Sequence, residues 1–161
     1  RAEVSAPFDP AGLLCREGVQ TGLAARGMPD LMQAMAAPLA RDSGVAQSLI
    51  AEAFVQRERV GSTAFGGGSV LPHARIAGLR RPTAAFATLA APIDLDALDR
   101  RPVDIVYALI SPEGAGADHL KALAAISRFL RDKGLLEKLR GADSADAVLA
   151  MMAAKSRNYG A

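Results

Sequence analysis

The sequence predicts a single α/β domain in which a mixed parallel and antiparallel sheet is flanked by helices on both faces. The chain has 161 residues, which is the usual size of one domain. Residues 103–110, VDIVYALI, are almost all apolar and rich in β-branched side chains, as in a strand covered on both faces. Stretches with apolar residues at helical spacing come before and after this strand, so helices can cover the two faces of a sheet.

The N-terminal part of the chain predicts a lead-in followed by two helices. Residues 1–10 contain two prolines and no apolar periodicity, so we expect a flexible segment there and the domain proper at 11–154. Pro29 opens a helix that we expect to stop or kink near Pro38, and a second helix is expected at 45–59. The side chains expected on the apolar faces are Leu31, Met32, Met35, Ala36 and Leu39, then Leu49, Ile50, Ala53, Phe54 and Val60.

The middle of the chain predicts strands. Four glycines within residues 61–68 make a helix there unfavourable, because ordering glycine backbone is costly. Residues 69–71 predict a short strand that ends at Pro72. Residues 84–89 predict another strand, and prolines separate it from the strand at 103–110.

The C-terminal part predicts three helices and a tail. We expect Asp118 to cap a helix at 119–132 that buries Leu120, Leu123, Ala124, Leu130 and either Ile126 or Ser127. Gly134 is expected to separate this helix from a short one at 135–140. Asp143 and Ser144 then precede a last helix that reaches about residue 154, and residues 155–161 are expected to form a polar tail.

Composition excludes several classes of function. The 19 basic and 17 acidic residues give a net charge of +2, too small and too scattered to indicate nucleic-acid binding. No apolar run reaches the roughly 18–20 residues of a membrane span, so we expect no membrane insertion. The single cysteine, Cys15, has no partner for an internal disulfide, and we interpret it as a small apolar residue in a cytoplasmic protein.

The segment at 66–76, GGGSVLPHARI, is the strongest candidate for a site. It is not a phosphate-binding Walker loop, because no Gly-Lys-Ser/Thr follows, and it is not a dinucleotide fingerprint, because no strand precedes it. Residues 66–68 can form a flexible turn, or they can let the backbone of a partner or a phosphate approach closely. The two histidines are 46 positions apart and have no carboxylate at helical spacing, so we expect no metal site and no cofactor. A hydrolase triad is not indicated, since no Gly-x-Ser-x-Gly occurs.

His73 can be either a loop residue or a nucleophile. A neutral imidazole attacks phosphorus well, and the ordinary histidine pKa of about 6.5 leaves much of it unprotonated at neutral pH. Such a site needs a cation for the phosphate charge and a group that orients the ring, and Arg57, Arg75 and His119 are available. Composition alone favours the loop histidine.

Three spaced segments, however, resemble the enzyme IIA proteins of the bacterial phosphotransferase system, of the fructose/mannitol and nitrogen-regulatory type. RERVGSTAFGGGSVLPHARI resembles their active-site segment, with its Arg-Glu, Gly-Ser-Thr, glycine-rich turn and Pro-His. APIDLDALDRRPVDIVYALISPE resembles the segment that leads into the family's buried strand. DHLKALAAISRFLRD resembles the helix that begins with a second histidine. The resemblance covers roughly residues 30–152 and extends more weakly toward residue 11.

The resemblance implies the roles of three residues. His73 corresponds to the histidine that accepts a phosphoryl group from a small HPr/NPr-like phosphocarrier protein. Arg57 corresponds to the arginine that steadies the phosphohistidine, and His119 corresponds to the neighbouring histidine. The protein would therefore be a phosphotransferase-system component with a phosphohistidine intermediate and not an ATP-dependent kinase. One position departs from the pattern: Gly67 stands where the family usually has a polar Asn or Glu, so no role can be transferred to it.

Two branches of the family are compatible with the sequence. The block from 57 to 76 resembles more closely the nitrogen-regulatory branch, which receives phosphate from a dedicated carrier and regulates other proteins. In that branch the targets would be proteins such as a potassium transporter or a sensor kinase. The alternative is a sugar-specific enzyme IIA that passes phosphate to a IIB domain during fructose or mannitol uptake. A third alternative is a relic that is never phosphorylated.

Overall fold

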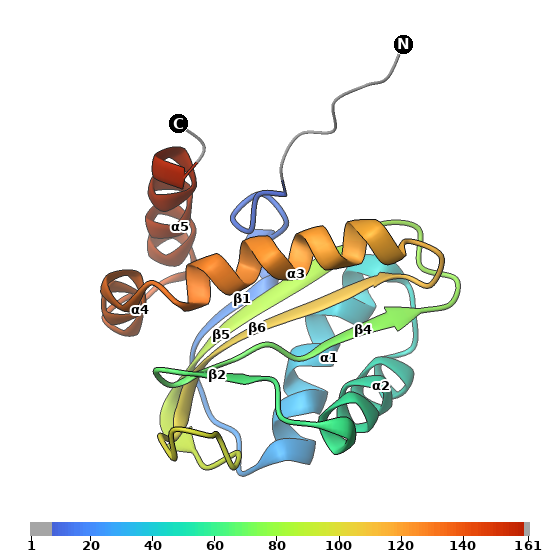
Figure 1. Cartoon of the computed structure of the whole chain (residues 1–161), viewed down its shortest axis with the longest axis horizontal. Coiled ribbons are helices and arrows are strands. Elements are labelled where there is room, and N and C mark those ends of the chain that lie inside the picture. The colour runs from blue at the N-terminus through green and yellow to red at the C-terminus, as the bar shows by residue number, and fades with distance from the viewer. Residues whose placement is uncertain (1–7, 160–161) are drawn as a thin grey trace.

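A six-stranded mixed sheet lies between two layers of helices in the computed structural model, which describes residues 8–159 (Figure 1). The elements in chain order are η1 (Arg16–Gly18), β1 (Val19–Leu23), α1 (Met28–Ser43), α2 (Gln47–Val60), β2 (Ala64–Gly66), β3 (Ser69–Val70), β4 (His73–Ile76), β5 (Thr83–Ile93), β6 (Val103–Pro112), α3 (Gly116–Leu130), α4 (Lys133–Arg140) and α5 (Ala145–Tyr159).

The sheet contains both parallel and antiparallel pairs, as the sequence predicts. Its strand order is β1-β5-β6-β3-β2, and β4 pairs with β6 beyond the end of β3. β1 runs parallel to β5, and both β3 and β4 run parallel to β6. β5 and β6 form the long antiparallel pair, and β2 and β3 form a short one. The central position of β6 explains why its sequence is apolar on both faces.

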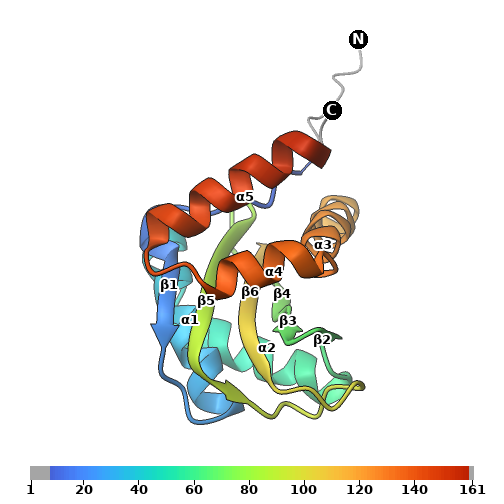
Figure 2. The same ribbon diagram turned by 90° about the vertical axis from the view of Figure 1, so that its left-hand side faces the viewer.

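Two hydrophobic clusters fill the space on either side of the sheet. α1 and α2 cover one face, and α3, α4 and α5 cover the other (Figure 2). Neighbouring residues of β6 divide between the clusters: Val106 belongs to the first and Tyr107 to the second. The predicted layered architecture, with helices on both faces, is therefore confirmed.

The domain extends beyond the predicted limits at both ends. Residues 1–7 of the expected lead-in lie outside the described residues, but residues 8–10 are fixed in place. The Tyr107 hydroxyl donates a hydrogen bond of 2.8 Å to the carbonyl of Pro10. At the other end, α5 continues to Tyr159, so the first residues of the expected tail are helical. Ser144 caps α5 as expected, since its hydroxyl accepts from the Ala147 N–H at 3.1 Å.

Several helix predictions were wrong in phase or boundary. α1 passes through Pro38 and ends at Ser43. α3 begins at Gly116, so Asp118 is inside the first turn and is not its N-cap. The apolar face of α3 is also rotated from the prediction: Leu120 is 68% exposed, whereas His119 is buried. Alanine is so frequent in this helix that the apolar spacing does not fix the phase.

The α3–α4 boundary and the face of α2 also differ from expectation. Gly134 lies inside α4, and Asp132 is the separating residue, because its carboxylate caps the N–H of Leu135 at 3.0 Å. In α2 the predicted core residues Leu49 and Val60 are 49% and 86% exposed. Both lie in the end turns of the helix.

Three strands were not predicted. β1 and β2 are short and carry glycine or polar residues, so they have no strong strand pattern. β4 begins directly after Pro72, where the sequence indicated a loop. Within the described part of the chain, no helix is long and apolar enough to cross a membrane.

Candidate active site

His73 is the first residue of β4, a strand at the edge of the sheet. It lies opposite Leu109 of β6, whose N–H donates to the carbonyl of Pro72 at 2.9 Å. Alternate residues of a strand point to opposite faces. Ala74 and Ile76 pack in the cluster beneath α1 and α2, so His73 and Arg75 face the side covered by α3. The strand pairing therefore fixes the backbone of His73, and the residue is not in a loop.

The hydrogen bonds of His73 define which ring nitrogen carries the proton. Nδ1 lies 2.7 Å from the carbonyl oxygen of Leu71, which can only accept, so Nδ1 carries the hydrogen. Nε2 then has a free lone pair. The Nε–H of Arg57 donates to this Nε2 at 3.3 Å. The ring is thus a neutral imidazole whose nucleophilic nitrogen faces a guanidinium group.

Local contacts at the end of α2 hold Arg57 and join this helix to the segment before His73. The Nη1 group of Arg57 donates to the carbonyl of Gly61 at 2.8 Å. The carboxylate of Glu58 accepts from both the N–H and the hydroxyl of Thr63. The Thr63 carbonyl in turn accepts from the N–H of Leu71 at 3.1 Å. This chain of contacts gives a structural reason for the Arg-Glu and Gly-Ser-Thr motifs: they tie α2 to the segment before His73.

His119 lies on α3 and faces His73 across the edge of the sheet. Its side chain is buried, and its ring centroid is 5.7 Å from that of His73, with a tilt of 43° between the rings. Nδ1 of His119 lies 2.7 Å from the hydroxyl of Ser111, near the end of β6. The structure therefore brings together Arg57, His73 and His119, the three residues that the sequence singles out.

Burial keeps both histidines neutral. Burial lowers the pKa of His73 below its ordinary value. The hydrogen bond to the Leu71 carbonyl raises the pKa, the charge of Arg57 lowers it, and the charge of Glu58 raises it. Burial also lowers the pKa of His119, with further lowering by His73 and Arg75. The lower pKa values mean that both rings are unprotonated at neutral pH, which is the form that a nucleophile requires.

Arg75 supplies a second cation on the same face of β4. It is exposed, and a Cβ atom placed on Gly116 would lie 3.6 Å from its Nη1 atom, so it lies against the start of α3. The first N–H groups of a helix point outward and favour negative charge. Arg57 thus lies beside His73, and Arg75 lies at the start of α3, where its charge acts on His119. This arrangement suits a transferring phosphoryl group.

Comparison with known proteins identifies the family. Residues 13–155 match the model of the phosphoenolpyruvate-dependent sugar phosphotransferase system, EIIA 2. The chain belongs to the EIIA 2 family. It is 40% identical to the nitrogen regulatory protein of Bradyrhizobium diazoefficiens over 141 aligned residues. These residues are 88% of this chain and 92% of the relative.

Two further comparisons place this EIIA 2 domain within the family. The crystal structure of nitrogen regulatory protein IIA-Ntr from Neisseria meningitidis superposes with a TM-score of 0.83 at 29% identity, covering 88% of this chain and 97% of the other. The fructose-specific EIIA component of Haloferax volcanii is 37% identical over 102 residues, which are 63% of this chain and 66% of that protein. The resemblance seen in the sequence is therefore confirmed.

The glycine turn of this EIIA 2 domain lies away from His73. Ser69 pairs with Ile105 and His73 with Leu109, so the turn is four residues, or about 13 Å, further along β6. Of the two readings of residues 66–68, the structure shows a turn, and its distance along β6 means that the glycines do not shape the immediate surroundings of His73. All three glycines have left-handed backbone conformations, with φ between +67° and +87°. They are required by the shape of this turn.

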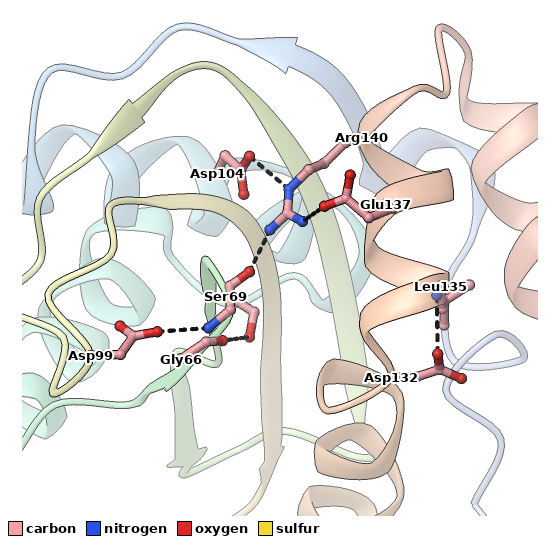
Figure 3. Close-up of polar contacts among 9 residues, drawn as sticks. Gly66, Ser69, Asp99, Asp104, Asp132, Leu135, Glu137 and Arg140 are labelled. Atoms are coloured by element: carbon pink, nitrogen blue, oxygen red, sulfur yellow. Dashed lines mark hydrogen bonds and ion pairs between the residues drawn. The ribbon is translucent and has the colours of Figure 1, made fainter.

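Arg140 of α4 holds the glycine turn on the face of the sheet that α3, α4 and α5 cover (Figure 3). Its guanidinium donates to the carboxylates of Asp104 at 2.8 Å and Glu137 at 2.5 Å, and to the carbonyl of Gly67 at 2.5 Å. The N–H of Gly67 donates to Asp99 at 2.9 Å. The position that is usually polar in the family is thus bound here through its backbone.

Sequence reasoning missed two residues of the site, Glu58 and Ser111. Glu58 is part of the quoted motif, but its contacts with Thr63 become visible only when the chain is folded. Ser111 is a lone hydroxyl at the end of an apolar strand, which was a weak signal. Cys15, which precedes η1, is exposed. Residues 8–159 contain no group of three or more His, Cys, Asp or Glu side chains that could hold a metal ion.

Proposed function

We propose that this EIIA 2 domain accepts a phosphoryl group on Nε2 of His73 from an HPr/NPr-like phosphocarrier and regulates partner proteins according to its phosphorylation state. The observation that carries the proposal is the state of His73: a neutral ring with its Nδ1 proton on the Leu71 carbonyl and its Nε2 lone pair beside Arg57. A neutral imidazole nitrogen is a good nucleophile toward phosphorus.

The transfer exchanges one N–P bond for another. Nε2 of His73 attacks the phosphorus of the carrier's phosphohistidine, and the bond from that phosphorus to the donor nitrogen breaks, so the electron pair returns to the donor ring. Positive charge develops on the His73 ring, and the Leu71 carbonyl stabilises it through the Nδ1 proton. Arg57 must then turn from the lone pair to the phosphoryl oxygens, where a guanidinium can donate two parallel hydrogen bonds.

His119 and Arg75 assist from the other side in this mechanism. His119 is close enough to donate a hydrogen bond to a phosphoryl oxygen carried by His73, since the two ring centroids are 5.7 Å apart. Arg75 adds charge at the start of α3. Neither residue is the acceptor, because the lone pair beside Arg57 belongs to His73.

Similarity favours the regulatory branch. A relative that is 40% identical and covers 88% of this chain is named a nitrogen regulatory protein. The alternative is a sugar-specific EIIA that passes phosphate to a IIB domain, and a fructose-specific relative at 37% identity supports it over a shorter span. The two functions differ in where the phosphoryl group goes next.

The first experiment tests the acceptor. The protein is incubated with phosphoenolpyruvate, enzyme I and the carrier, and the product is examined by intact mass. We expect one added phosphoryl group that is labile in acid and stable in base. His73→Ala should fold and gain none, while the matched control His119→Ala should still gain one, more slowly. Uptake of phosphate by His73→Ala would disprove the assignment.

A second experiment separates the two branches. Phosphorylated protein is mixed with fructose- or mannitol-type IIB domains, and each candidate target is titrated with both forms of the protein. The regulatory function predicts slow or no transfer to IIB and a difference of at least about tenfold in target affinity, equal to 1.4 kcal/mol. Rapid transfer to IIB with equal target affinities would favour the sugar-specific alternative.

A further inference from the structure

Ser111 is a buried hydroxyl at the end of an otherwise apolar strand. It has no exposed surface, and it lies opposite Arg75 in the pairing of β4 with β6. Within residues 8–159 the hydroxyl of Ser111 has one hydrogen-bond partner, Nδ1 of His119 at 2.7 Å. A buried polar group of this kind needs its partner, because an unpaired hydroxyl in the interior is costly.

This single contact settles the direction of the hydrogen bond. If Nδ1 of His119 carried the hydrogen, it would donate to the Ser111 oxygen, and the serine's own hydrogen would have no acceptor among the described residues. If Ser111 donates to Nδ1, both groups are satisfied. The second arrangement leaves the His119 proton on Nε2.

We propose that Ser111 is a positioning residue that holds His119 as its Nε2–H tautomer, so that His119 donates a hydrogen bond toward a phosphoryl group on His73. The inference rests on the proposed function. It makes the two rings complementary: His73 carries its proton on Nδ1 and its lone pair on Nε2, and His119 has the reverse arrangement. The rings are 5.7 Å apart, close enough for one phosphoryl group to bridge them.

The low pKa of His119 supports this arrangement. Burial, His73 and Arg75 all lower it, so the ring is neutral and has only one N–H. A neutral ring donates from Nε2 only in the right tautomer, and without a partner on Nδ1 the tautomers would mix. Groups that orient a metal-binding histidine in this way typically cost about 10–100-fold in metal affinity or activity when removed. We expect an effect of similar kind at the lower end of that range here, about tenfold, because part of the population keeps the correct tautomer.

Ring nitrogen NMR of the unphosphorylated protein gives the direct test. In the wild type we expect Nδ1 of His119 to be unprotonated and Nε2 to be protonated. Ser111→Ala should mix the two tautomers, and Ser111→Thr, which keeps the hydroxyl, should preserve the wild-type pattern. Protonation of Nδ1 in the wild type would overturn the proposal, whether or not the variants fold.

Transfer kinetics then test the role. We expect Ser111→Ala to slow phosphoryl transfer from the carrier about tenfold and Ser111→Thr to restore most of the rate. In a His119→Ala background, Ser111→Ala should have no further effect, because its action passes through His119. Equal slowing in both backgrounds would show a packing role and overturn the proposal. A wild type that accepts no phosphate would disprove the proposed function, and the tautomer would then decide the Ser111 assignment alone.

Discussion

His73 is held as a neutral imidazole by a balance of effects on one ring. Burial and the Arg57 charge lower its pKa, whereas the Leu71 carbonyl and Glu58 raise it. The carbonyl also places the proton on Nδ1. A single arginine beside the lone pair disfavours protonation of Nε2, and under the proposed function the same arginine would bind the phosphoryl oxygens after transfer.

The lowered pKa values predict that the protein loses stability in mild acid. The pKa values of His73 and His119 lie below the ordinary 6.5, so an unfolded chain binds more protons than the folded one just below that pH. The stability that the neutral histidines contribute is complete above 6.5 and is lost as the pH falls toward the folded pKa values. Denaturant unfolding should therefore give constant stability around pH 7–8 and a decrease between about pH 6.5 and pH 5.5.

The non-titrating variant His73→Asn provides the matched control. Carboxylates contribute mainly at lower pH, and they are the same in both proteins. The decrease in stability on going from about pH 7.5 to about pH 5.5 should be smaller in the variant than in the wild type. Identical decreases would mean that His73 titrates in the folded protein as it does in the unfolded chain.

At the scale of elements, the glycine turn closes one end of β6. Gly68 has φ +87°, and its carbonyl accepts from the N–H groups of both Asp104 and Ile105. A Cβ atom at this position would lie 2.6 Å from Nη2 of Arg140 and 2.9 Å from Oδ1 of Asp104. The absence of a side chain therefore lets the arginine and its carboxylate close over the turn.

Gly68→Ala should destabilise the fold strongly without changing the chemistry at His73. The left-handed backbone costs an alanine about 1–2 kcal/mol. Displacing the Arg140–Asp104 pair adds roughly 1–3 kcal/mol. The free energy of unfolding from denaturant titration measures the sum. At a temperature where the variant is folded, phosphoryl uptake should match the wild type, because the turn is about 13 Å from His73 along β6.

Gly78→Ala is the matched control for this prediction. Gly78 has φ +84°, and no atom lies within 4 Å of a Cβ placed there. This variant therefore has the backbone cost alone. Equal destabilisation of the two variants would show that Arg140 and Asp104 move aside easily and do not hold the turn.

Elements with one dominant pattern could be predicted from sequence, and elements that depend on tertiary pairing could not. The strand at 103–110 was recognised because both of its faces are buried. β1 was missed because VQTGL has little apolar character of its own and is stabilised by pairing with β5. β4 was missed because Pro72 reads as a stop, although the pairing of Pro72 with Leu109 is made by its carbonyl and needs no N–H.

The residues of the site also divide into those that a sequence motif predicts and those that depend on tertiary contacts. Arg57, His73 and His119 were predicted through their motifs, but their distances, tautomers and burial depend on three different elements meeting at one edge of the sheet. Ser111 could not be assigned from sequence, because its importance depends on His119 facing inward. The predicted phase of α3 placed Leu120 inward, and the structure places His119 there.

At the scale of the whole molecule, the two ends of strand β6 carry different features. β4, which begins at His73, pairs with the later half of β6, and the loop between β5 and β6 lies at the start of β6 (Figure 1). Each end has a highly exposed apolar side chain: Val60, three residues after Arg57, is 86% exposed, and Leu98, in the β5–β6 loop, is 98% exposed. A partner that delivers a phosphoryl group to His73 must cover the end of α2, since Arg57 is within 3.3 Å of the acceptor nitrogen.

Val60→Ser should weaken docking of the carrier without affecting the transfer step. Burying a valine side chain fully is worth about 1.5–3 kcal/mol, and partial burial in a transient complex is worth about 1 kcal/mol. Losing this contact should raise KM for the phosphorylated carrier about fivefold. The value of kcat should stay unchanged, because Val60 contacts none of the reacting groups in the structure, and an interaction present equally in the ground and transition states changes KM alone.

Leu98→Ser provides the control, because it removes an exposed apolar side chain that is at least as large. Leu98 is in the loop whose Asp99 binds the backbone of Gly67, far along β6 from His73. Steady-state kinetics of both variants should therefore differ: Leu98→Ser should keep the wild-type KM, and Val60→Ser should not. If Leu98→Ser raises KM as much as Val60→Ser does, the carrier responds to general surface hydrophobicity. If Val60→Ser lowers kcat instead, the end of α2 acts on the position of Arg57 and not on docking.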